Sequence, residues 1–386
     1  MRPILSFMRW QAAGGVALLA ATAVALIWAN ATPAGYATFW ATDIAGHSLA
    51  SIINDGLMTI FFLLIGLEIK RELAVGELSD RRAAALPVAA AIGGMLLPAL
   101  IYLALTAGSP VSDGWGIPMA TDVAFALAVL TAVRSGVPQS IWAFLLGVAV
   151  IDDIGAVVVI AVAYSDGVAW PWLLGAVVAL AAMRVLVRMK VTMVAPYVLL
   201  GVLAWALTAM SGVHATIAGV AIGLLMPARA SVRRPHDDEA DSAVTRLIHL
   251  LEPWSSFLVL PLFALANAGI VLRASVFEVP GATLGAVSVA VALVVGKAVG
   301  LPLGAWAALR LRLGRMPDGS TWGQMLGVAL LGGIGFTVSL FVADLAFDDP
   351  SVNGAVKAGV LAGSLVAAGL GALVLTRAGR RRAAAN

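Results

Sequence analysis

Twelve apolar runs, each long enough to cross the hydrocarbon core of a lipid bilayer, dominate this sequence and limit what it can fold into. A membrane-spanning helix needs about 20 predominantly apolar residues. The runs are centred on residues 12–29, 52–69, 84–107, 117–134, 141–164, 169–187, 194–209, 212–226, 253–271, 282–308, 323–346 and 355–376. The pattern predicts an all-α membrane protein with twelve transmembrane helices in a single domain, residues 1–386.

Composition excludes several kinds of site. Of the 386 residues, 61% are hydrophobic and 12% are charged, against about 25% charged in a soluble domain. The chain has no cysteine, which excludes disulfides, thiolate metal sites and cysteine nucleophiles. No glycine-rich phosphate loop or nucleic-acid-binding pattern occurs, and the polar stretch Pro227–Arg246 is interpreted as a solvated loop. We therefore expect no cofactor and no nucleic-acid partner.

The distribution of basic residues predicts the orientation in the membrane. All but three of the 24 Lys and Arg residues fall on the side of the N-terminus, in alternate connections. The exceptions are Arg273 and Lys357 on the other side, and Lys297 inside an apolar run. Because basic residues near helix ends are retained in the cytoplasm, both termini are predicted to be cytoplasmic. One alternative is a signal peptide that ends near Ala31, which would leave eleven spans.

Four charged residues lie inside predicted spans: Asp122, Asp152, Asp153 and Lys297. Each costs about 2.5–3.5 kcal/mol at the centre of a spanning helix. An ion pair between Lys297 and one aspartate that only locks helices together is one explanation, but it leaves two carboxylates unexplained. Intramembrane ionisable groups usually mark an ion or proton path, and we favour that interpretation.

Two of the spans are interrupted. The run 117–134 contains Pro118, Thr121 and Asp122, and the run 323–346 contains the sequence GGIG at residues 332–335. Proline removes a backbone donor and glycine weakens a helix, so both runs are predicted to be discontinuous. Close packing through small residues is the alternative for the glycines.

The interrupted runs are spans 4 and 11, the central members of the triplets at about residues 84–164 and 282–376. Equivalent spans of the two triplets are offset by seven, an odd number, so the triplets enter the membrane from opposite sides and can form inverted repeats whose broken helices cross at the midplane. Facing helix N-termini would favour a carboxylate such as Asp122. Facing C-termini would favour a cation such as Lys297.

Seven segments, in order over nearly the whole chain, resemble the NhaA family of bacterial sodium/proton antiporters. They are GLEIKREL (66–73), ATDVAFAL (120–127), AVIDDIGA (149–156), SGVHATIAG (211–219), LPLFALANAG (260–269), VGKAVG (295–300) and GIGFTVSLF (333–341). Proteins of that family contain inverted repeats, so the predicted repeats agree with the resemblance but are not independent support for it.

The resemblance implies a multi-pass protein of the bacterial inner membrane with an uncleaved N-terminus. It implies an electrogenic, pH-regulated exchange of Na+ for H+, with Li+ as a further candidate ion, and no enzymatic activity. It also implies a homodimer through the 31–50 loop. Residues Gly35–Ile44 within that loop are rich in aromatic residues and threonine, which is typical of a strand, and an interfacial segment held by Trp40 and Tyr36 is the alternative. The resemblance implies a small hairpin at the dimer contact.

The carboxylates suggest how exchange works. Burial and a neighbouring like charge both favour the protonated form of an acid, and oxygens that hold a proton can alternatively hold a hard cation. The resemblance assigns Na+ binding to Asp153, with Asp152 and Thr121 as further ligands. It makes Asp152 a proton carrier that pairs alternately with Lys297, and places Thr121 and Asp122 at the helix crossing. Burial lowers the proton affinity of an unpaired lysine, so Lys297 is an alternative proton carrier.

A second cluster is implied by the resemblance to form a pH-responsive cation funnel; its members are Glu68, Arg71, Glu72, His249, Glu252 and, farther along, His214. Glu68, Arg71 and Glu72 share one helix face. An ordinary surface ion pair is the alternative for these three, and a hydrogen-bonded structural role is the alternative for His214. Ile248 stands beside His249 where the family pattern has an acidic residue.

Three other functions fit parts of the sequence. A sodium-coupled symporter for an organic solute would share the architecture but needs groups for that solute. An intramembrane aspartyl protease would need two facing aspartates, such as Asp122 and Asp153, but the Gly-x-Gly-Asp signature is absent. A passive channel is disfavoured by Lys297 and by the paired acids.

Overall fold

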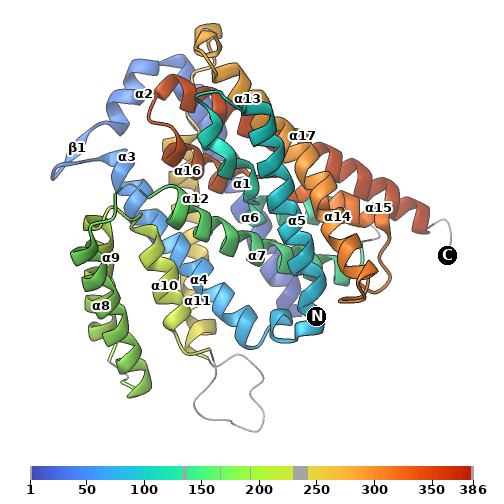
Figure 1. Ribbon diagram of the computed structural model, residues 1–386, viewed down its shortest axis with the longest axis horizontal. Coiled ribbons are helices and arrows are strands. Elements are labelled where there is room, and N and C mark those ends of the chain that lie inside the picture. The colour runs from blue at the N-terminus through green and yellow to red at the C-terminus, as the bar shows by residue number, and fades with distance from the viewer. Residues whose placement is uncertain (1, 134–136, 166, 192, 229–241, 384–386) are drawn as a thin grey trace. The chain divides into compact units, whose positions relative to one another are not determined.

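The computed structural model describes residues 2–133, 137–165, 167–191, 193–228 and 242–383, and these are predominantly helical (Figure 1). The all-helical class predicted from the apolar runs is therefore confirmed for the described residues. Most of the predicted loop Pro227–Arg246 lies outside them, as does Arg134.

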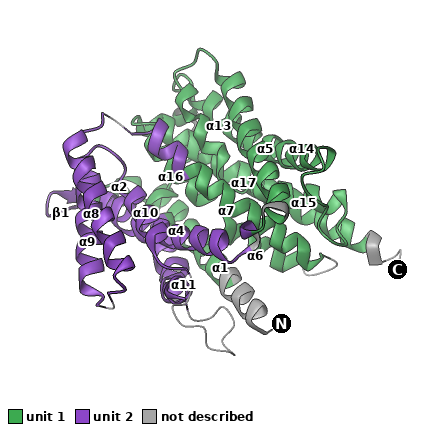
Figure 2. Cartoon of the chain, turned by 60° about the horizontal axis from the view of Figure 1, so that its bottom comes forward, with its two compact units in different colours: residues 1–38, 80–156, 264–386 green, residues 39–79, 157–263 purple. Residues whose placement is uncertain are grey.

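The chain divides into two compact units (Figure 2). Unit 1 comprises residues 1–38, 80–156 and 264–386, and unit 2 comprises residues 39–79 and 157–263. The elements of unit 1 are α1 (Arg2–Ala31), α5 (Arg81–Thr106), η3 (Ser112–Met119), α6 (Val123–Val133), η5 (Ala274–Glu278), α13 (Ala282–Val291), η6 (Ala292–Gly296), α14 (Lys297–Arg310), α15 (Trp322–Gly332), α16 (Phe336–Ala346) and α17 (Pro350–Ala383).

Unit 2 contains the small sheet and the remaining helices. Its elements are β1 (Asp43–Ile44), β2 (His47–Ser48), α3 (Leu49–Ser51), η1 (Ile52–Leu57), α4 (Met58–Ala74), η2 (Glu77–Ser79), α8 (Trp170–Arg188), α9 (Ala195–Met210), α10 (Thr216–Leu225), α11 (Ala243–Trp254) and η4 (Ser255–Val259). Three helices contribute residues to both units: α2 (Pro33–Trp40), α7 (Gln139–Ala163) and α12 (Leu260–Asn267).

Within the described residues, eight helices are long and apolar enough to cross a membrane. They are Ala13–Ala31, Leu49–Ala74, Ala83–Thr106, Gln139–Ala163, Trp170–Arg188, Ala243–Asn267, Ala282–Arg310 and Pro350–Arg380. Two shorter apolar helices, α9 and α10, coincide with the predicted runs 194–209 and 212–226.

Two further pairs of helices pass the same test only when taken together. The helix η3 is bent by 45° from α6, and α15 by 43° from α16, each at a short break. Each pair is either a broken span or a re-entrant loop. The breaks fall at residues 120–122 and 333–335, where the sequence places the Thr-Asp and GGIG segments.

The predicted run 253–271 begins too late. The structure starts α11 at Ala243, because the Ser242 hydroxyl accepts a hydrogen bond from the Thr245 amide and caps the helix. His249 and Glu252 therefore lie within the helix and not at its start.

The expectation of strand structure over Gly35–Ile44 is wrong for most of that segment. Residues 33–40 are helical, and the hydroxyl of Tyr36 lies 2.7 Å from the carbonyl oxygens of both Leu265 and Ala266, which ties the helix to the end of α12. A hairpin is present but short: Ile44 pairs with His47 around a turn in which Ala45 and Gly46 both have positive φ. Such turns match the natural twist of a hairpin.

Small residues allow the helices of each unit to touch backbone to backbone, as is common in membrane proteins. In unit 2, a Cβ placed on Gly223 of α10 would stand 2.7 Å from the carbonyl oxygen of Leu63 and the backbone of Gly66 in α4. In unit 1, a Cβ on Gly304 of α14 would stand 2.1 Å from the carbonyl oxygen of Ala89 in α5.

We expect Gly223→Ala to lower the free energy of unfolding by about 1–3 kcal/mol, because the added methyl group meets backbone atoms that have no room to move. Gly201→Ala in α9 is the matched control, since its Cβ would find Ile222 at an ordinary 3.5 Å. Thermal unfolding of the detergent-solubilised protein measures both. Equal midpoints for the two variants would contradict the packing described here.

Candidate functional site

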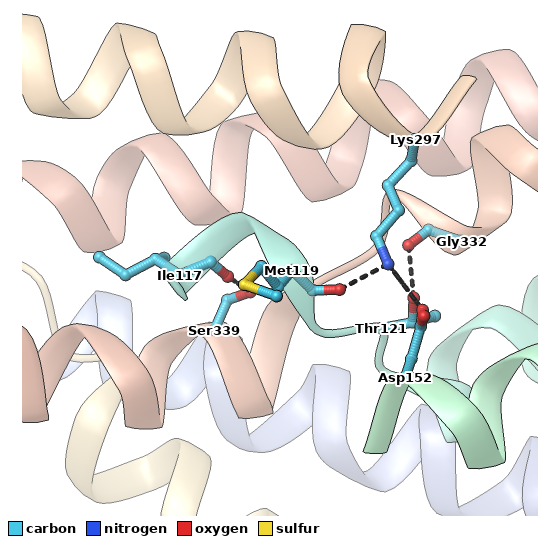
Figure 3. Close-up of polar contacts among 7 residues, drawn as sticks. All are labelled: Ile117, Met119, Thr121, Asp152, Lys297, Gly332 and Ser339. Atoms are coloured by element: carbon cyan, nitrogen blue, oxygen red, sulfur yellow. Dashed lines mark hydrogen bonds and ion pairs between the residues drawn. The ribbon is translucent and has the colours of Figure 1, made fainter. Parts of the chain in front are cut away.

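The two helix breaks of unit 1 meet at a crossing held by backbone and side-chain hydrogen bonds. The amide of Asp122 donates to the carbonyl oxygen of Ile334 at 2.6 Å, which joins one break directly to the other. A second bond joins the helices next to the breaks: the Ser339 hydroxyl of α16 donates to the carbonyl oxygen of Ile117 in η3 at 2.6 Å (Figure 3). Breaking both helices exposes backbone groups in a buried region, and these bonds satisfy part of them.

Asp122 caps the N-termini of both helices that leave the crossing. Its Oδ1 accepts from the Phe125 amide at 3.0 Å, at the start of α6. Its Oδ2 accepts from the Thr337 amide at 3.3 Å and from the Thr337 hydroxyl at 2.6 Å, at the start of α16. The carboxylate is 3% exposed and faces the positive ends of two helix dipoles, which stabilise a negative charge.

Lys297 lies at the C-terminal end of η3, where helix carbonyl groups are left unpaired. Its ammonium group donates to the carbonyl oxygen of Met119, the last residue of η3, at 2.6 Å (Figure 3). It also donates to Asp152 Oδ2 at 2.6 Å and to the Thr121 hydroxyl at 3.1 Å. Lys297 and Asp152 are both 0% exposed, so their ion pair is fully buried.

Thr121 links this ion pair to α15. Its hydroxyl oxygen lies 2.7 Å from Asp152 Oδ2 and 2.7 Å from the carbonyl oxygen of Gly332, the last residue of α15. A hydroxyl has one proton, so it donates to only one of these acceptors at a time. The lysine and the threonine together thus contact the C-terminal ends of both broken helices.

The two adjacent aspartates of α7 have different surroundings. Asp152 Oδ2 receives the hydrogen bonds of Lys297 and Thr121, whereas Asp152 Oδ1 is buried and accepts no hydrogen bond from any described residue. Asp153 is 8% exposed and points about 100° around the helix from Asp152. Asp153 is therefore the more accessible of the two acids.

Direct side-chain contacts join the predicted residues Thr121, Asp152 and Lys297. Asp122, next to Thr121 in the chain, contacts Thr337 and Ile334 of the other break instead. Sequence analysis missed Thr337 as the partner of Asp122, and it missed the carbonyl groups of Met119 and Gly332. The signal for the carbonyls was present, because every helix that ends inside the membrane leaves its last carbonyls unpaired.

The residues of the predicted pH-responsive cluster lie in unit 2 and are only partly brought together. Glu68 interacts electrostatically with Arg71, Glu252 and Glu72. Arg71 and Glu72 form a loose, partly exposed ion pair at 3.8 Å. His249 is exposed, whereas Ile248 is buried against Leu64 and Leu67, which explains an apolar residue at that position.

His214 is separate from that cluster. Its Nε2 lies 2.5 Å from the carbonyl oxygen of Tyr164 and donates to it in the tautomer that carries the proton there. Within the described residues, no group of three or more His, Asp or Glu side chains is arranged as a metal site.

Comparison with known proteins identifies a protein family that the chain matches over most of its length. A family model described as "Na+/H+ antiporter 1" matches residues 5–375. A protein of Caulobacter vibrioides named "Na(+)/H(+) antiporter NhaA" is 47% identical over 375 residues, which cover 96% of this chain and 89% of the relative. "Na(+)/H(+) antiporter NhaA 2" of Pseudomonas syringae pv. syringae is 46% identical over 98% of this chain and 96% of its own length. "Na(+)/H(+) antiporter NhaA" of Anaeromyxobacter sp. is 42% identical, with 97% and 91% covered.

We expect Lys297→Met to lower the free energy of unfolding by about 3–5 kcal/mol, because the Asp152 carboxylate would stay buried without its partner. Adding Asp152→Asn should restore most of that loss, since the orphaned charge is removed. Lys357→Met is the control. It breaks a pair with Asp344 whose side chains are 10% and 20% exposed, so a smaller loss is expected. Thermal unfolding checks the series, and a double variant no more stable than Lys297→Met would contradict the buried pair.

Proposed function

Because the chain belongs to the Na+/H+ antiporter 1 family, it exchanges Na+ for H+ across a membrane, and we propose that the exchange takes place at the crossing of the two helix breaks. The observation that carries this proposal is the buried contact of Lys297, Asp152 and Thr121 beside Asp153. The relatives are named antiporters, which are transporters, and we propose no enzymatic activity and no resident cofactor for this chain. The symporter alternative is not favoured.

We further propose twelve spans in a single membrane domain over residues 1–386. The eight long helices, the two bent pairs and the two shorter helices α9 and α10 together account for this number. In this arrangement η3/α6 and α15/α16 are discontinuous spans 4 and 11, in inverted repeats at about residues 84–164 and 282–376. The bends of 45° and 43° and the capping of paired helix ends support it.

Na+ is the substrate, and we assign its direct binding to Asp153, with oxygens of Asp152 and Thr121 as further ligands. Carboxylate and hydroxyl oxygens are the ligands that hard cations prefer. Asp152 Oδ1 supports this assignment, because it accepts no hydrogen bond from the described residues and so can accept a proton or contact an ion. A proton and Na+ cannot occupy the same oxygens, and this exclusion couples the two ions.

The proton enters this competition through Asp152 and Lys297. While Asp152 is ionised, Lys297 neutralises it at 2.6 Å and holds the carbonyl end of η3. Protonation of Asp152 removes the charge that Lys297 compensates, so the lysine is then free to release a proton or to change partner. Protonation of Asp152 alone leaves the buried cluster with one net positive charge. Loss of a proton from Lys297, or of a bound Na+, restores the balance and lowers the cost of burial.

We propose electrogenic transport, in which more protons than sodium ions cross per cycle. Each net charge then responds to the membrane potential by about 2.3 kcal/mol per 100 mV. Because basic residues fall in alternate connections, we propose a bacterial inner-membrane location with both termini in the cytoplasm. The hairpin at residues 43–48 supports a homodimer contact through the 31–50 loop.

We propose that Glu68, Arg71, Glu72 and Glu252 form a pH-responsive cation funnel, because three carboxylates and one arginine interact there. His249 lies on the same helix as Glu252 and is exposed, and we propose it as the solvent-facing member of this cluster. His214 is assigned a structural role from its contact with the Tyr164 carbonyl.

We expect Asp153→Asn to abolish sodium-driven proton movement, because a neutral amide does not bind Na+ strongly or exchange a proton. Purified protein in liposomes with a pH-sensitive dye measures this. Asp344→Asn, which removes an aspartate from another Asp–Lys pair in unit 1, should retain exchange. Substantial residual exchange in Asp153→Asn would refute the assignment of Na+ to this residue.

We expect Glu68→Gln to change the pH profile of exchange, since it removes one of three interacting carboxylates. His214→Ala should leave the shape of the profile unchanged while lowering thermal stability, because its hydrogen bond is structural. Exchange rates between pH 6 and 9 compare the variants. Profiles that coincide for Glu68→Gln and the wild type would reject the funnel.

A further inference from the structure

Two buried leucines flank Lys297 on its own helix, one turn to either side. Leu293 lies four residues before the lysine and is 0% exposed, and Leu301 lies four residues after it and is 2% exposed. Residues four apart lie along one face of a helix. The leucines therefore lie near the same face of the helix as Lys297.

Leu301 fills space left by two missing side chains. A Cβ on Gly332 would stand 2.9 Å from Leu301 Cδ1, and a Cβ on Gly94 of α5 would stand 2.8 Å from Leu301 Cγ. Gly332 is the last residue of α15, and its carbonyl oxygen contacts Thr121. Leu301 thus occupies a socket formed by α5 and by one end of the α15/α16 break.

Leu293 makes a similar contact with the other end of the break. A Cβ on Gly335 would stand 2.2 Å from Ser339 Oγ and 2.9 Å from Leu293 Cδ2, and a Cβ on Gly333 would stand 2.5 Å from the backbone carbonyl oxygen of Leu293. Leu293 belongs to the π-helical turn η6, which leads directly into Lys297. Single π-turns inside longer helices are frequent at functional sites.

The back of α14 is also fixed. A Cβ on Gly296 would stand 2.6 Å from the Cα of Pro98, and one on Gly300 would stand 2.3 Å from the carbonyl oxygen of Gly93. Gly296 and Gly300 thus pack directly against α5, while Leu293 and Leu301 pack against the α15/α16 break. These contacts on two sides restrict translation and rotation of α14.

We propose that Leu301 and Leu293 are positioning residues that seat Lys297 in register with the α15/α16 break, and that the glycines of the break serve as sockets for these leucines. The inference rests on the proposed function, because it gives Lys297 a place in the ion site. It assigns a role to two apolar side chains that carry no charge and bind no ion.

The geometry of Lys297 explains why such seating matters. Its ammonium group makes two bonds of 2.6 Å and one of 3.1 Å to groups on different segments. Hydrogen bonds of this kind weaken beyond about 3.2 Å, so a shift of the helix by a fraction of an ångström changes all three. A displaced lysine would alter the competition for the Asp152 oxygens.

The test places a methyl group in the socket. Leu301 is 2% exposed and packs closely against Gly94, so its side chain has little space in which to turn away from an added methyl group. We therefore expect Gly332→Ala to displace Leu301 and the helix of Lys297 and to raise the KM for Na+ by about tenfold, with a smaller change in maximal rate. Gly327→Ala is the matched control on the same helix, because its Cβ would meet Leu375 of α17 at 2.6 Å and not the helix of Lys297. It should lose thermal stability but keep the KM of the wild type.

A smaller side chain at position 301 tests whether contact with Leu301 causes the effect of Gly332→Ala. Leu301→Val shortens the side chain that Gly332→Ala would strike, so the double variant should recover a KM near that of the wild type. Exchange in liposomes and thermal unfolding are measured for the wild type, Gly332→Ala, Gly327→Ala and the double variant.

The inference is overturned if Gly332→Ala and Gly327→Ala lose stability alike while both keep the KM of the wild type. It is also overturned if the double variant has the same KM as Gly332→Ala. Absence of exchange in the wild type would overturn the proposed function, and this inference with it, whereas an active wild type with an unaffected Gly332→Ala rejects only the seating of Lys297.

Discussion

Two helices that end inside a buried region leave backbone groups and partial charges that must be satisfied there, and the rest of unit 1 is arranged around this requirement. Asp122 caps the N-termini of α6 and α16, while Lys297 and Thr121 contact the carbonyl ends of η3 and α15. The carboxyl group of Asp122 thus stabilises a pair of helix N-termini, and the ammonium group of Lys297 lies at the pair of C-termini, whose polarity is opposite. Water would normally satisfy such groups, and its replacement by charged side chains gives this region its polar interior.

The same arrangement brings together Lys297, Asp152 and Thr121, the groups at which we propose that Na+ and H+ compete. Lys297 is needed at the carbonyl of Met119 for structural reasons, and this position also brings it against Asp152. Structure and the proposed exchange therefore use the same bonds. In the proposed exchange, an ion or proton that changes the charge of Asp152 would also weaken or strengthen the contact of Lys297 with the carbonyl group of Met119 at the end of η3.

Apolar packing supports the polar centre. Close contacts between α14 and α5 at Gly296 and Gly300 hold the lysine helix from behind, and the leucines on either side of Lys297 fill spaces beside the glycines of the second break. In membranes, where helices gain little from burying apolar surface, such shape complementarity carries much of the association. The glycines of the break are thereby explained by what occupies their space as much as by flexibility.

The sequence by itself determined the helical membrane class, and it predicted interruptions at the residues where η3 bends from α6 and α15 bends from α16. It also supplied the set of charged residues that are buried there and in the neighbouring helices α7 and α14. These follow from the length of apolar runs and from the cost of charge in lipid, which are local properties. It did not determine that Thr337 would share the carboxylate of Asp122, that the carbonyl of Gly332 would face Thr121, or that residues 33–40 would be helical. Those outcomes depend on contacts between segments far apart in the chain, and only the tertiary structure decided them.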